Sequence, residues 1–180
     1  MDSNIAISQA PAPAGFLAPR ITGLVYLLYF LAAIASKLLM DNGRAGIGSA
    51  VYLASTLLYI TVTLLLVRFL RPAGPLLALV ALVPSLLGCA YDLLRQFQLA
   101  PFQINSLAFY WAFDLLLGIL ILRSTFVPRF MGAVLVLAGI GLLVFVAVPG
   151  GSALVAPVYA LAFIAEFELM VWLLVKGVKQ

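Results

Sequence analysis

Residues 130–148 read FMGAVLVLAGIGLLVFVAV, a run without a single charged side chain. Pro128 and Arg129 precede the run, and Pro149 and Gly150 follow it. A helix needs roughly 20 apolar residues to cross the ~30 Å hydrocarbon core of a bilayer, because it rises about 1.5 Å per residue. We therefore expect residues 130–148 to form a transmembrane helix.

Five further apolar runs share this length and composition. They cover about 21–39, 48–67, 74–94, 106–122 and 154–175. Helices are the expected form, because lipid offers no hydrogen-bond partner to the backbone. The strands of a membrane barrel would alternate polar and apolar residues over about ten positions, and these runs do not. The sequence thus predicts an all-α integral membrane bundle of six transmembrane helices, with residues 20–180 forming one domain.

The N-terminal segment differs from the rest of the chain. Residues 1–19 combine three prolines with Ala, Ser and Gly, and this composition predicts a disordered lead-in. An alternative starts from Ala-Ile-Ala at 33–35 before Ser36, which resembles a signal-peptidase site. We favour a retained first helix, because Arg20 is the only cation of the supposed leader and 35 residues would precede the cut.

Composition excludes several classes of function. Hydrophobic residues make up 66% of the 180-residue chain and charged residues 9%, against about 25% charged in soluble domains. The chain has no histidine and one cysteine, Cys89, so a zinc cluster, a Ser-His-Asp triad and an internal disulfide are excluded. The net charge of +4 is spread over the ends of apolar runs. We expect no cofactor, no metal and no nucleic-acid partner.

The positions of the basic residues predict the orientation. Cytoplasmic loops of membrane proteins carry an excess of Lys and Arg. One side of the predicted bundle collects seven basic residues: Arg20, Arg68, Arg71, Arg123, Arg129, Lys176 and Lys179. The other side collects three: Lys37, Arg44 and Arg95. We therefore expect both termini in the cytoplasm and a multi-pass protein of the cell's inner membrane.

Several stretches carry a family resemblance. They are RITGLVYLL at 20–28, LRPAGPLLALVALV at 70–83, RSTFVPRFMGAVLVLAGIG at 123–141 and WLLVKGV at 172–178. Together they resemble a family of small bacterial membrane proteins catalogued as domain of unknown function 4386. The Arg-Ser-x-x-x-Pro-Arg loop is the most specific piece. The resemblance implies the membrane architecture and no particular activity.

Ionisable side chains inside the spans are the candidate binding residues. An ionisable group at the centre of a membrane helix costs about 2.5–3.5 kcal/mol on insertion scales, so its presence suggests a function. Lys37, Asp92 and Asp114 fall in the outer half of the predicted bundle, and Glu166 falls near its middle. We expect these four residues to line one outward-facing pocket with Glu166 as its floor.

A structural explanation competes with this one at every position. Lys37 and Asp92 can extend to the outer interface, and Asp92 can pair with Arg95 three residues along the helix. For Asp114 and Glu166 we favour burial inside the bundle, each with a hydrogen-bond partner, although such groups can also serve only to hold helices together. Glu168 lies two residues from Glu166 and is therefore expected on the opposite face of its helix.

Aromatic residues form a second pattern. We favour an interfacial belt and core packing over a ligand-lining aromatic box, and Tyr110 and Trp111 suit the belt in particular. The residues concerned are Tyr26, Tyr29, Tyr52, Tyr59, Tyr91, Tyr110, Trp111 and Tyr159.

Three functions remain open. The chain could bind or transport a small lipophilic or cationic molecule through buried carboxylates. It could instead be a structural or accessory subunit whose partner is another membrane protein. The weakest alternative is an enzyme that acts on lipid with Asp92 and Asp114 as an acid/base pair, so whether the chain is an enzyme is uncertain, and we lean towards no.

Overall fold

Each of the six predicted runs forms one helix. The computed structural model describes residues 17–100, 104–147 and 155–175, and no residue in these ranges forms a strand. The helices are α1 (Leu17–Asp41), α2 (Ala45–Leu70), α3 (Pro75–Gln96), α4 (Leu107–Arg123), α5 (Arg129–Ala147) and α6 (Val155–Val175). A short 3-10 turn, η1 (Arg71–Ala73), joins α2 to α3. The all-α prediction is thus confirmed for the described residues.

The start of α1 corrects one predicted boundary. Residues 17–19 were expected in the disordered lead-in, but they form the first turn of α1. Pro19 does not prevent this, because a proline in the first turn of a helix removes no intrahelical hydrogen bond. Residues 1–16 of the expected lead-in, and the basic residues Lys176 and Lys179, lie outside the described residues.

The surface of the bundle is apolar. Four helical segments of the described chain are long and apolar enough to cross a membrane: Pro19–Asp41, Ala45–Ala73, Pro75–Gln96 and Pro157–Val175. Large side chains point outward along the helices, with Leu76 75% exposed and Leu137 57% exposed. Thr63 and Ser85, in contrast, are fully buried. Apolar residues outside and polar residues inside are the distribution of a membrane protein.

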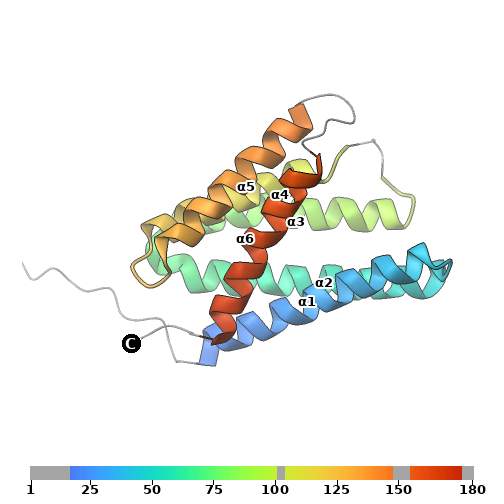
Figure 1. Ribbon diagram of the computed structural model, residues 1–180, viewed down its shortest axis with the longest axis horizontal. Coiled ribbons are helices and arrows are strands. Elements are labelled where there is room, and N and C mark those ends of the chain that lie inside the picture. The colour runs from blue at the N-terminus through green and yellow to red at the C-terminus, as the bar shows by residue number, and fades with distance from the viewer. Residues whose placement is uncertain (1–16, 101–103, 148–154, 176–180) are drawn as a thin grey trace, which may run out of the picture.

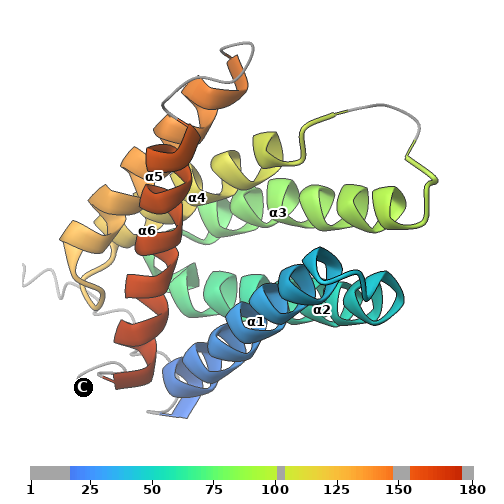
Figure 2. The same cartoon turned by 45° about the vertical axis from the view of Figure 1, so that its right-hand side comes forward.

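The helices form a closed ring. Each helix packs against its neighbours in the chain, and α6 packs against α1 to complete the circle. Figures 1 and 2 show the α2–α3 and α4–α5 connections at one end of the bundle and the α1–α2 turn at the other. We call the end with residues 71–74 and 124–128 the closed end. The end with residues 42–44 and 97–100 is the open end.

Glycines allow the tightest contacts of the ring. A Cβ placed on Gly118 of α4 would lie 2.7 Å from the carbonyl oxygen of Gly132 on α5. A Cβ on Gly23 of α1 would lie 2.8 Å from the backbone nitrogen of Leu174 on α6. Small residues that let backbones approach this closely are the usual basis of helix packing in lipid.

The closed half of the ring is filled by a solid apolar core. Its fully buried aliphatic side chains include Leu66, Leu70, Leu117, Leu120, Ile121, Leu135 and Leu173, which come from α2, α4, α5 and α6. One buried polar contact lies at the edge of this core, a 2.8 Å hydrogen bond between the hydroxyls of Thr63 and Ser85. It joins the closed half of α2 to the middle of α3.

Candidate functional site

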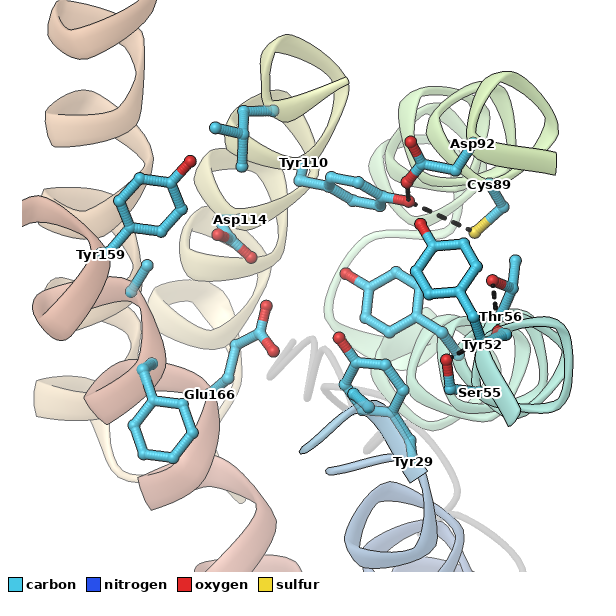
Figure 3. A pocket seen from close by; sticks show the side chains of 15 residues that line it. Tyr29, Tyr52, Ser55, Thr56, Cys89, Asp92, Tyr110, Asp114, Tyr159 and Glu166 are labelled. Carbon is cyan, nitrogen blue, oxygen red and sulfur yellow. Dashed lines mark hydrogen bonds between the residues drawn. The ribbon is translucent and has the colours of Figure 1, made fainter. Parts of the chain in front are cut away.

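The open half of the ring is hollow. A cavity of about 300 Å³ is lined by side chains from α1, α2, α3, α4 and α6, which converge on it in Figure 3. On three helices the inward-facing residue changes from polar to apolar within one turn, and this change forms the floor of the cavity. The pairs, each written from cavity to core, are Tyr59 and Val62 on α2, Asp114 and Leu117 on α4, and Glu166 and Leu169 on α6.

Asp114 is the most deeply buried of the carboxyl groups in this cavity. Its side chain leaves α4 towards the cavity (Figure 3), and the residue is only 1% exposed. The expected burial is therefore present. The expected hydrogen-bond partner is missing at Oδ1, which is buried without one among the described residues. A buried acceptor that lacks a partner costs about 1–3 kcal/mol, and more when the group is charged.

Glu166 enters the cavity from the other side of the ring. It projects from α6 towards the same space as Asp114 (Figure 3), and the two carboxyl groups act on each other electrostatically. Glu166 and Tyr26 of α1 act on each other electrostatically across the α1–α6 contact. The hydrogen bond that we expect Glu166 to make across the bundle stays a prediction. Glu166 itself is half-buried, since it faces the open cavity.

Asp92 occupies the wall formed by α3. Its Oδ2 atom accepts a 2.8 Å hydrogen bond from the Tyr110 hydroxyl of α4, and that hydroxyl also lies 4.0 Å from the sulfur of Cys89. Asp92 therefore bonds to a neighbouring helix, and no ion pair with Arg95 is found among the described residues. Asp92 and Asp114 line the same cavity, Asp92 from α3 and Asp114 from α4, and their use as an acid/base pair stays a hypothesis.

Tyrosines make up much of the remaining wall. Five of the seven tyrosines line the cavity: Tyr29, Tyr52, Tyr59, Tyr110 and Tyr159. The hydroxyl of Tyr59 is buried without a hydrogen-bond partner. The expected core packing is present at Tyr26 and Tyr59. Tyr110 was expected in an interfacial belt and instead bonds to Asp92 in the cavity wall, and the indole nitrogen of Trp111 is buried.

Lys37 is the one candidate binding residue that the structure keeps away from the cavity. Its ammonium group forms a 2.9 Å ion pair with Asp41, one turn further along α1, and its side chain is 76% exposed. The i,i+4 spacing of Lys37 and Asp41 suits such a surface pair. Lys37 therefore extends to the surface beside the α1–α2 turn, which is the structural explanation considered above.

Glu168 faces the other side of α6, as its spacing from Glu166 predicted. It lines an apolar groove of about 480 Å³ on the surface of the bundle. We call this the α6 groove; its residues are Met131, Phe163, Ile164, Phe167, Glu168, Val171, Trp172 and Val175. Phe163 also lines the cavity, so it borders both hollows.

The cavity is lined by carboxyl groups and aromatic rings. Three carboxyl groups and five tyrosines line it, and no lysine or arginine is among the described residues around it. Carboxylates and the faces of aromatic rings both attract cations. No group of three or more His, Cys, Asp or Glu residues able to hold a metal ion occurs in the described part of the chain.

Comparison with known proteins identifies the family. The chain is a membrane protein of several helices with an interior cavity, and residues 91–177 match the family model described as "Domain of unknown function (DUF4386)". The chain thus carries this domain over its second half, which confirms the family that the loop motifs suggested. Asp92, Asp114 and Glu166 all fall inside the matched segment. No curated protein and no solved structure matches the chain.

Proposed function

We propose that all six helices cross the inner membrane as one domain, with both termini in the cytoplasm. Four helices have the length and hydropathy of spans, and the ring contacts of α4 and α5 put these two apolar helices beside them. The excess of basic residues on the closed-end side supports a cytoplasmic closed end. Reporter fusions test this: those near Gly74 and Thr125 should report the cytoplasm, and one near Gly43 the outside. An odd number of crossings would contradict it.

The function that the cavity supports best is the binding of a small organic cation from the open end, with or without its transport. Asp114 carries this proposal, because its carboxyl group is almost fully buried, points into the cavity and has an Oδ1 atom without a partner. A cation beside Asp114 and Glu166 would relieve the repulsion between the two carboxylates and supply the missing partner. In a low-dielectric cavity the repulsion between the carboxylates and their attraction to a cation are both stronger than in water.

The size and wall of the cavity narrow the ligand class. About 300 Å³ lies at the lower limit of ordinary small-molecule sites, so the cavity suits a compact organic ion. Tyrosine faces bind alkylated ammonium groups well, because a bulky cation sheds its water easily. The filled core below Asp114 leaves the open end as the approach. A substituted ammonium ion fits each of these features.

A pair of isosteric ligands tests the role of charge. The purified protein in lipid nanodiscs is titrated calorimetrically with choline and with 3,3-dimethylbutanol, in which carbon replaces the charged nitrogen. We expect choline to bind at least tenfold more tightly, and Asp114→Asn to lower its affinity at least tenfold. Equal binding of the two ligands, or no binding of choline, tetramethylammonium and tetraethylammonium, would overturn the proposal and favour an accessory subunit.

Asp41→Asn is the matched control. It makes the same chemical change at a carboxylate that is exposed on α1 and lies outside the cavity. The substitution removes the surface ion pair between Lys37 and Asp41, which is worth about 0–1 kcal/mol. The protein should therefore remain folded and should bind choline as before. An equal loss of affinity in Asp41→Asn and Asp114→Asn would assign the effect to overall charge and contradict a site at Asp114.

A further inference from the structure

Phe163 lies between two hollows of different character. On one side of it lies the cavity with its carboxyl groups, and on the other lies the α6 groove, whose wall is apolar apart from Glu168. Phe163 is half exposed and packs edge-on against Phe30 of α1, with ring centroids 5.4 Å apart. It also stacks on Phe167, 5.8 Å away. The Phe163 side chain therefore forms part of the wall of the cavity and part of the wall of the groove.

The groove follows α6 from this point to the closed end. Phe167 and Val171 succeed Phe163 at intervals of four residues, so all three lie along one stripe of the helix. The stretch from Phe163 to Val175 extends about 18 Å at 1.5 Å per residue. One leaflet of the hydrocarbon core is about 15 Å thick. The groove thus has the length and the polarity of a site for one extended hydrocarbon chain.

We propose that the ligand is a cationic amphiphile, with its ammonium head in the cavity and its alkyl chain in the α6 groove. This inference rests on the proposed function and names the substrate class for the same site. Charge complementarity places the head beside Asp114 and Glu166, and the shared border at Phe163 leads the chain into the groove. The head then lies near the middle of the bundle and faces the open end, and the tail runs along the closed half of α6.

Alkyl-chain length tests the role of the groove. Affinities for tetramethylammonium and dodecyltrimethylammonium are measured on the full chain in nanodiscs, at concentrations below micelle formation. We expect the long-chain ligand to bind at least tenfold more tightly. Val171→Trp, which fills the groove, should reduce the ratio of the two affinities at least fivefold. The lipid background is the same for all variants, so partition of the ligand into the bilayer cancels from this comparison.

Leu79→Trp serves as the control. Leu79 is an exposed residue of α3 and lies outside both hollows, so the same bulky substitution there should leave the ratio unchanged. If tetramethylammonium binds but the longer chain adds no affinity, or Val171→Trp keeps the wild-type ratio, the amphiphile is wrong and the cation site stands. If neither ligand binds, the proposed function fails as well. Melting temperatures near that of the wild type show that both variants are folded.

Discussion

The closed and open halves of the ring are built from the same helices and differ in what those helices turn inward. On α2, α4 and α6, the inward residue changes from Tyr, Asp or Glu to Val or Leu within one turn. Below this level, leucines from four helices fill the centre. Above it, carboxyl groups and tyrosines surround empty space. The boundary lies at a similar depth on all three helices, so it acts as a floor.

This difference separates stability from binding. Lipid tails are as apolar as leucine, so the closed half is held together by close packing, and its glycines permit backbone contacts that larger residues would block. The open half contains buried polar atoms without partners, at Asp114 and Tyr59, which cost stability. A protein retains such atoms where a ligand satisfies them. The predictions below test this division, beginning with the largest expected effect.

Gly118→Val should be the most damaging single change. A Cβ at Gly118 would meet the backbone oxygen of Gly132 and the backbone nitrogen of Val136, and neither can move without shifting α5. We expect a loss of about 3 kcal/mol or more, at the upper end of overpacking effects, measured by thermal melting in detergent. Gly46→Ala is the control, because a Cβ there meets nothing within 4 Å and alanine favours the helix. Unchanged melting of Gly118→Val would mean that α4 and α5 do not pack as described.

Leu117→Ala should cost about 2–3 kcal/mol, within the range for truncation of buried leucines. Leu117 is fully buried directly below Asp114, so its removal opens the floor into the core. Leu137→Ala is the matched control on the lipid-facing side of α5 and should change stability by less than about 0.5 kcal/mol. Equal costs at the two positions would contradict a packed closed half.

Asp114→Leu should stabilise the protein while it abolishes cation binding. The substitution removes a buried acceptor without a partner, and the adjoining cavity has room for the larger side chain. We expect a gain of about 1 kcal/mol in thermal unfolding, since the desolvation penalty of such a group is about 1–3 kcal/mol. A marked destabilisation would mean instead that Asp114 holds helices together, which is the structural explanation weighed at the outset.

The bond between Thr63 and Ser85 should contribute least. Double-mutant cycles in membrane proteins give an average of about 0.6 kcal/mol for hydrogen bonds between helices. We expect a coupling of this size from the cycle of Thr63→Val, Ser85→Ala and the double variant, measured by unfolding in mixed micelles. A coupling near zero would show that the boundary between the two halves is held by packing alone.

The helices and most of the site were predictable from the sequence, for different reasons. Long apolar runs define spans by length, and the six helices follow them. Asp92, Asp114 and Glu166 were found because an ionisable group inside a span needs an explanation. Lys37 was assigned to the pocket although Asp41, one turn away, already offered it a partner at the surface. The i,i+4 spacing to Asp41 therefore decided where the Lys37 side chain lies. The depth of Lys37 along the helix did not decide it.

The tyrosine wall could not be deduced in the same way. A helix that is apolar on every face, such as α4 or α6, carries no periodic signal that marks its inward side. Whether Tyr110 lies in a belt or in a cavity depends on how α4 rotates against α3, and that rotation is set by contacts such as Gly88 against Phe109 and Tyr110. Asp92 likewise finds its partner on α4 and not along its own helix. These pairings arise between two different helices, so the pattern of one helix does not contain them.

The contact between α6 and α1 also constrains how the protein is made. The ribosome makes the helices in chain order, so α2 to α5 can each dock on the helix before them as they arrive. The ring stays open until α6 follows, because Leu174 must reach Gly23 and Glu166 must reach Tyr26. Until then Tyr26 and Asp114 face the interior of an incomplete bundle, where the insertion machinery or water must cover them. The cavity is therefore complete only with α6, which supplies Tyr159, Phe163 and Glu166 to its wall.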